Sequence, residues 1–207
     1  MRTHLSEPAI FIADAPALDF LNSIATPIDE IVDWIGDADG LLDWLEQSGW
    51  VSRQTLEGVA QSAMPGELDG VAAQARALRG WFRAFVLKHQ GTPLTPEVMD
   101  ELATLNRLLE RDDGFTQITL ANQGPASLQL QPRRRWKTPE SLLLPIGEVL
   151  AKFICEEDFA DVKSCEGAGC TLMFVDHTRG KKRRWCSMAV CGNRAKAAAH
   201  RQRKKLL

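Results

Sequence analysis

Four of the five cysteines of this 207-residue chain form two pairs near its C-terminus, and their spacing limits the fold more than any other feature. Cys165 and Cys170 are a C-x4-C pair, and Cys186 and Cys191 form a second one after fifteen intervening residues. Two loops that each supply two thiolates provide the tetrahedral sulfur set that zinc prefers. In a reducing compartment this pattern favours a metal over disulfides, with an iron–sulfur cluster as the alternative. We therefore predict one zinc ion on these four cysteines.

Four cysteine ligands complete the coordination sphere of zinc and leave no position for water or substrate, so the predicted metal is structural. Between the pairs, residues 172–175 are an apolar segment predicted to be a strand, and residues 183–185 are predicted to return as its partner. A helix is predicted from about residue 188 or residue 191 to residue 205. A hairpin between two knuckles, followed by a helix, describes a small treble-clef-like zinc finger.

The charge of the chain is divided sharply between its two parts. Residues 163–207 contain twelve Lys and Arg against two acidic residues, a local charge of +10, whereas the whole chain carries −2. Such a division indicates two functional pieces, with the basic piece facing an anionic partner. Charge compensation at a zinc–thiolate centre would explain one or two nearby arginines, but not the basic residues further along the chain.

The predicted last helix is rich in alanine and carries Arg and Lys on neighbouring strips, which suits the major groove or the phosphate backbone of DNA. A solvated basic tail, RNA, and an acidic protein or lipid partner are the alternatives. Arg194 has two interpretations, a base contact or support for the zinc site. We predict nucleic-acid contacts by Lys181, Lys182, Arg183, Arg184, Arg194, Lys196, Arg201, Arg203, Lys204 and Lys205.

The first 160 residues are predicted to be mainly helical. Asp37 and Ser52 are candidate N-caps, and apolar residues recur at helical spacing over residues 71–89. Thr95 and Thr138 each precede Pro-Glu, a combination that is typical of helix starts. Cys155 ends an apolar segment and is predicted to be a small buried residue, with a reactive thiol as the alternative.

Between residues 115 and 132 the apolar period changes from helical to alternating. Ile118 and Leu120, then Leu128 and Leu130, alternate with polar residues around a turn at 122–125, which predicts a β-hairpin. The predicted fold class is therefore α+β. A mainly helical domain with a hairpin spans residues 1–160, and the zinc finger spans residues 161–207.

The first domain is predicted to sense a small-molecule effector or to form a homodimer. Asp19 and Asn22 lie three residues apart and are candidates to line a polar pocket, although capping a helix is the alternative role for them. The run Arg133-Arg134-Arg135 either extends the basic surface or pairs with the acid-rich helices.

Several classes of protein are disfavoured because the sequence lacks their characteristic motifs. There is no P-loop, dinucleotide fingerprint, G-x-S-x-G or H-E-x-x-H motif, so an enzyme with its site in the first domain is the least favoured hypothesis. No apolar run approaches the ~18–20 residues that a membrane span needs, and residues 1–16 do not resemble a signal peptide. The sequence thus predicts a cytoplasmic protein without a membrane partner.

Short motifs at both ends of the chain are similar to those of a known family. Residues 174–176 (FVD), 183–188 (RRWCSM) and 191–194 (CGNR) resemble the CGNR-type zinc finger. Residues 17–23 (ALDFLNS) and 43–45 (DWL) resemble the ABATE domain that precedes this finger in the family. The match covers residues 165–200 and, more loosely, most of the chain. The resemblance implies a stress-induced transcription regulator of bacteria, with zinc on the four cysteines named above.

Overall fold

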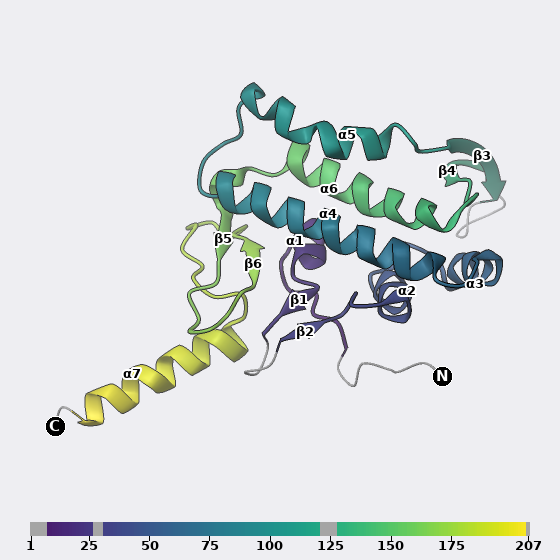
Figure 1. Cartoon of the computed structure of the whole chain (residues 1–207). Helices are drawn as coiled ribbons and strands as arrows, with labels where there is room; N and C mark the ends of the chain where they lie inside the picture. Colours follow the sequence, from purple (N-terminus) through teal and green to yellow (C-terminus); the bar gives the residue numbers. More distant parts are fainter. Residues whose placement is uncertain (1–7, 27–30, 121–127, 206–207) are drawn as a thin grey trace.

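The computed structural model of the chain describes residues 8–26, 31–120 and 128–205 (Figure 1). Its body is built from α1 (Pro16–Leu21), α2 (Ala38–Gln47), α3 (Arg53–Ser62), α4 (Glu67–His89), α5 (Ala103–Leu109) and α6 (Leu143–Glu156), with 3-10 turns η1 (Pro96–Leu102), η2 (Pro139–Leu142) and η3 (Phe159–Asp161). Short antiparallel pairs join β1 (Ile24–Ala25) to β2 (Val32–Asp33), β3 (Gly114–Leu120) to β4 (Leu128–Arg134), and β5 (Val162–Ser164) to β6 (Met173–Val175). A π-helical turn, η4 (Met188–Gly192), leads into α7 (Asn193–Lys205).

Local sequence signals place most of the helix starts. The Asp37 carboxylate accepts a hydrogen bond from the N–H of Gly40 at 2.8 Å, and Ser52 Oγ accepts one from the N–H of Thr55 at 3.3 Å, so both predicted caps are confirmed. The starts predicted at Thr95 and Thr138 are also found, but the first turns there are the 3-10 helices η1 and η2. In this α+β arrangement α4, α5 and α6 lie side by side across the body (Figure 1).

One hydrophobic core runs through the helical body and into the cysteine-rich segment. Phe153 of α6 packs edge-on against Phe82 of α4 and contacts Phe159, with ring centroids 5.7 Å and 5.3 Å apart. Phe174 of β6 is fully buried in the same cluster, together with the ligand cysteines Cys165, Cys186 and Cys191. The core therefore continues across residue 160, and the division of the chain at that point stays a prediction.

The first helix is joined to β6 through Asn22, the residue at its C-terminal end. The Asn22 Nδ2 donates to the carbonyl of Met173 at 2.8 Å, and its Oδ1 accepts from the Met173 N–H at 3.0 Å. Two residues further on, the Val175 N–H donates to the carbonyl of Ala13 at 3.0 Å. Residues 13–22 thus occupy one edge of β6.

The prediction that residues 183–185 pair with β6 is wrong. Residues 183–185 form no strand, and β6 instead pairs with β5, in the register Val162↔Val175 and Ser164↔Met173. The physical reason is that β6 has two edges, of which Asn22 and Ala13 hold one while β5 takes the other. No free edge remains for the segment that precedes Cys186.

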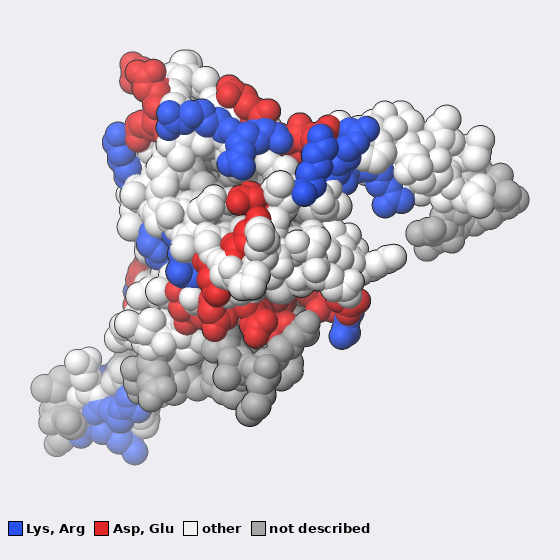
Figure 2. Space-filling model, turned by 45° about the vertical axis from the view of Figure 1, so that its right-hand side comes forward, with Lys and Arg blue, Asp and Glu red and all other residues white. Residues whose placement is uncertain are grey.

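The predicted hairpin is present as β3 and β4, and it leaves the body as an arm that is largely white in Figure 2. Ile118 lies opposite Leu130, and Leu120 lies opposite Leu128. All four side chains are 66–72% exposed, so the apolar face of the hairpin points to solvent rather than into the core. The predicted turn at 122–125 lies outside the residues that the structure describes.

Cys155 is exposed near the end of α6, so the prediction that it is buried is wrong. The preceding residues Phe153 and Ile154 occupy the buried face, and the 100° step per residue of a helix turns the next side chain outward. Within the described part of the chain, every helix is too short or too polar to cross a bilayer.

Candidate metal centre and nucleic-acid interface

The four cysteines predicted as ligands come together in one cluster, with their Sγ atoms all within 4.8 Å of one another. The Sγ of Cys186 lies 3.8 Å from that of Cys170 and 3.7 Å from that of Cys191. A tetrahedron with Zn–S bonds of about 2.3 Å has edges of about 3.8 Å, whereas a disulfide requires about 2.05 Å. The four sulfurs therefore fit one zinc ion.

The electrostatics of the cluster also fit a cation. A hydrogen bond from Cys186 lowers the pKa of Cys170 to about 5. The same contact raises the pKa of the Cys186 thiol far above its usual range, and burial raises the pKa of Cys191 to about 11. Thiols this close cannot all ionise unless a positive charge lies among them. When bound, zinc supplies that charge and contributes folding free energy, and the four sulfurs leave it no open position.

Glycine allows the first cysteine loop to close around the metal. A Cβ atom on Gly167 would lie 2.9 Å from Cys191 Sγ and 3.3 Å from Cys170 Cβ. Gly169 adopts φ of 74°, a left-handed conformation that favours glycine. Backbone N–H groups of Gly167 and Cys186 donate to Cys165 Sγ at 3.4 Å and 3.3 Å. The two glycines between the first pair were a sequence signal that the ligand prediction did not use.

Gly167→Ala is expected to weaken zinc binding by about 10- to 100-fold, because the added methyl group displaces a ligand sulfur. Competition with a chromogenic chelator measures the affinity. Gly180→Ala is the matched control in the same module, since a Cβ there has no atom nearer than 4.0 Å. Equal zinc affinities for the two variants would contradict this assignment of Gly167.

Arg183, predicted to contact nucleic acid, is engaged by the protein itself. Its side chain is 20% exposed and lies over the ring of Phe174, 4.2 Å from the ring centroid. Its guanidinium group donates to the carbonyls of Cys186 at 2.6 Å, Trp185 at 3.0 Å and Ile12 at 3.3 Å, and to the carboxylate of Asp14. Arg183 therefore joins the finger to the segment that precedes α1.

The buried carboxylate of Asp176 organises the turn between the two cysteine pairs. It accepts from Lys163 Nζ at 2.6 Å, from Thr178 Oγ1 at 2.6 Å and from the Arg183 N–H at 2.9 Å. Burial alone would raise the pKa of Asp176, but these hydrogen bonds hold the pKa far below its usual range. The carboxylate is therefore ionised and fixes the path of residues 176–183.

The other predicted basic residues have different surroundings. Lys181 Nζ pairs with Asp161 at 2.5 Å, and Arg184 pairs with Glu166 at 2.6 Å. Lys182 is exposed. Exposed positions on α7 hold Arg194, Lys196, Arg201, Arg203 and Lys204, while Lys205 lies on the same helix with a side chain outside the described part. The structure thus brings the predicted cations to one end of the molecule, but three of them, counting Arg183 with Asp14, are paired with acids.

Two protein-family models match this chain. A model of the CGNR zinc finger matches residues 162–204, which include the whole sulfur cluster. The ABATE model, described as "Putative stress-induced transcription regulator", matches residues 14–157. The chain belongs to the ABATE family. Among curated proteins no sequence matches it.

In this ABATE protein Asp19 and Asn22, the predicted pocket residues, both bind main-chain groups. Asn22 is fully buried, and both ends of its amide bind the main chain of Met173. Asp19 Oδ1 accepts from the N–H groups of Ile12 and Ala13 at 2.9 Å and 3.0 Å. Both side chains hold backbone segments in place: Asp19 binds the segment before α1, and Asn22 binds β6 rather than capping a helix.

Asp19 is expected to titrate near pH 6. Burial raises the pKa of Asp19 to about 6, although the hydrogen bonds from Ala13 and Ile12 oppose the shift and the charge of Asp14 adds to it. A raised folded-state pKa contributes stability below about pH 4 that is lost as the pH rises through 6. Relative to Asp19→Asn, the free energy of unfolding should fall by roughly 1 kcal/mol between pH 5 and pH 7.5, after allowance for solvent screening. Carboxyl carbon-13 NMR measures the midpoint, and a value near 4 would contradict the burial argument.

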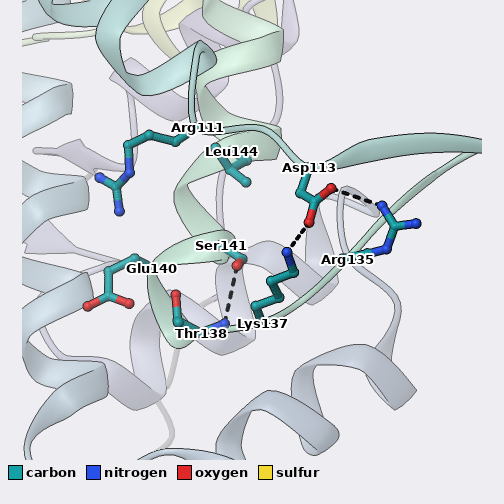
Figure 3. A pocket seen from close by; sticks show the side chains of 8 residues that line it. All are labelled: Arg111, Asp113, Arg135, Lys137, Thr138, Glu140, Ser141 and Leu144. Atoms are coloured by element: carbon teal, nitrogen blue, oxygen red, sulfur yellow. Dashed lines mark hydrogen bonds and ion pairs between the residues drawn. The ribbon is translucent and has the colours of Figure 1, made fainter.

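The run of three arginines on β4 and after it meets several acids. Arg134 pairs with Asp112 at 2.6 Å and with Glu148 at 2.9 Å. Arg135 pairs with Asp113 at 2.9 Å, and Lys137 contacts the same carboxylate at the edge of a cavity of about 210 Å³ (Figure 3). Pairing with acids, rather than extension of a basic surface, therefore accounts for two of the three arginines.

Proposed function

We propose that this ABATE protein is a transcription regulator that binds duplex DNA through its CGNR finger, with α7 as the principal contact. The single observation that carries the proposal is the position of α7. The helix leaves the body and points into solvent (Figure 1), and its basic side chains gather away from the acidic residues of the body (Figure 2). The family description agrees with this role.

The shape and charge of α7 suit a DNA groove. Its 13 residues span about 20 Å, and the alanines at 195 and 197–199 keep it slim. Arg194 and Arg201 lie seven residues apart, so they share one face. Among the residues that the structure describes, no carboxylate pairs with Lys196, Arg201, Arg203 or Lys204. These side chains are available to phosphates.

The metal centre would hold this helix in place. Cys191 belongs to η4, which runs directly into α7, so the last zinc ligand lies one turn before the first basic residue of the helix. Asn193 Nδ2 donates to the carbonyl of Ala189 at 3.1 Å and joins the two segments. In this proposal zinc fixes the direction of α7, Arg183 supports the finger, and Lys182 and the α7 cations contact DNA.

Duplex affinity is expected to fall steeply with salt, because each neutralised phosphate releases counterions. If four to six phosphates are neutralised, the slope of log K against log [salt] should be about −4 to −5. The triple variant Arg201→Gln/Arg203→Gln/Lys204→Gln should reduce the magnitude of that slope by about 3, since three contacts are lost. Fluorescence anisotropy with a labelled duplex over a range of salt concentrations gives both values.

Arg107→Gln is the matched control, since Arg107 is an exposed arginine on α5, away from the finger. It should leave the slope unchanged. A wild-type slope near zero, or equal slopes for the control and the triple variant, would refute DNA binding through α7. Competition between a duplex and a structured RNA at one salt concentration distinguishes DNA from RNA as the partner, and preference for RNA would favour the alternative hypothesis.

A further inference from the structure

A second cavity, of about 520 Å³, lies between the start of α3, the base of the β3–β4 hairpin and α6. Its volume falls within the range of small-molecule sites, about 300–1,000 Å³. None of the residues predicted from the sequence as ligand contacts lines it. The cavity is also separate from the zinc finger, whose residues take no part in its walls.

Aromatic residues form part of a wall that also contains several polar and charged residues. Trp50, Phe115 and Trp136 come from three different segments and all line the cavity. Trp50 packs edge-on against Trp44 of the core, with ring centroids 4.9 Å apart and an interplanar angle of 87°, so its indole is fixed. A ring held in this way offers apolar surface on which another planar ring packs favourably. Arginine side chains lie over the other two rings, Arg134 over Trp136 and Arg135 over Phe115.

The charged residues of the wall favour an anion. They are Arg133, Arg134 and Glu148, with a net charge of +1. Arg134 is committed to Asp112 and Glu148, and Glu148 also pairs with Lys152 at 2.8 Å. Arg133 is exposed, and within the described ranges no carboxylate pairs with it. Two of the three consecutive arginines line this cavity, and of these two Arg133 is the one for which the described ranges show no acidic partner.

Two hydroxyl groups add hydrogen-bonding capacity where α3 lines the cavity. Ser52 Oγ and Thr55 Oγ1 lie 2.9 Å apart at the start of the ten-residue helix α3, and both residues line the cavity. The positive end of the α3 dipole supports the preference for an anion that Arg133 establishes.

We infer that this cavity binds a small planar aromatic carboxylate, whose ring packs between the tryptophans while its carboxylate pairs with the Arg133 guanidinium. Guanidinium and carboxylate groups form paired, charge-assisted hydrogen bonds. The inference concerns binding alone and does not depend on the proposed contact with DNA. An effector that enters here would touch both the helical body and the projecting hairpin.

The test uses the full zinc-loaded chain and three matched probes, 2-naphthoate, 2-naphthamide and 2-naphthylmethylammonium. Calorimetry should show 2-naphthoate binding about tenfold or more tightly than the neutral amide, with the cation weakest. The indole N–H signals of Trp50 and Trp136, assigned through Trp→Phe variants, should shift with 2-naphthoate while those of Trp81 and Trp185 do not.

Arg133→Gln should weaken 2-naphthoate binding by about tenfold and leave 2-naphthamide binding unchanged, because only the anion uses the guanidinium. Arg107→Gln, which makes the same charge change outside the cavity, should alter neither. Circular dichroism confirms that both variants are folded. The inference is overturned by equal binding of the anion and the amide, by tightest binding of the cation, by an unaffected Arg133→Gln variant, or by no heat with about 5 mM 2-naphthoate.

Discussion

Cys186→Ser is expected to abolish zinc binding and to lower duplex affinity by about 100-fold or more, because the metal supplies much of the folding free energy of so small a module. Cys186 is buried, and its Sγ touches two of the other three sulfurs. Its carbonyl also accepts a hydrogen bond of 2.6 Å from the Arg183 guanidinium. Loss of zinc therefore loosens both the start of α7 and the contact with the helical body.

Elemental analysis measures the zinc content of this variant, and hydrogen exchange measures the protection of residues 162–205. Both should fall, while amides of α4 and α6 stay protected. Cys155→Ser is the matched control, since Cys155 is the one cysteine outside the cluster and its side chain is exposed. A Cys186→Ser protein that retained one zinc per chain and full duplex affinity would refute both the metal site and its role in orienting α7.

Arg183→Gln is expected to lower the free energy of unfolding by about 2–3 kcal/mol, because several carbonyl groups lose a charged donor in a half-buried site. The loss of the guanidinium from the face of Phe174 adds to this cost. The pair with Asp14 contributes less, because the Asp14 side chain is 55% exposed. Urea denaturation of the zinc-loaded protein measures the change.

The salt dependence of duplex binding separates the structural role of Arg183 from a phosphate contact. Arg183→Gln should leave the salt slope unchanged when the protein is folded. Arg201→Gln should do the opposite, with unchanged stability and a slope smaller in magnitude by about 1. If Arg183→Gln were as stable as the wild type and reduced the slope, Arg183 would be a DNA contact, as the sequence alone had suggested.

The parts of the fold that depend on nearby residues could be predicted from the sequence. The caps at Asp37 and Ser52 satisfy N–H groups only three residues away, so their sequence signal is local. The cysteine spacing similarly specifies a four-sulfur set before any fold is known. The strand β6 was identified from its apolar run, but its partner depends on which of two edges the distant residues Ala13 and Asn22 occupy.

The parts that could not be predicted depend on contacts between distant segments. An arginine beside a zinc ligand looks like a phosphate contact until Asp14 and Ile12, about 170 residues earlier, are seen to surround it. The apolar alternation of the hairpin is visible in the sequence, yet nothing local states whether Leu128 and Leu130 meet a core or water. The cavity lined by Trp50, Phe115 and Trp136 could not be predicted, because these residues come from three segments that are distant in the sequence.

The joint at Asn22 has a consequence for how this protein tolerates change. Because the amide of Asn22 recognises only the peptide groups of Met173, it places no demand on which side chain stands at position 173. A finger transplanted from a relative should keep both hydrogen bonds with any residue at position 173 that fits this buried site, provided that its backbone follows the same path. Substitution of Asn22 itself should be tolerated far less, since no other side chain at position 22 places an amide donor and an amide acceptor at the same distance from the main chain.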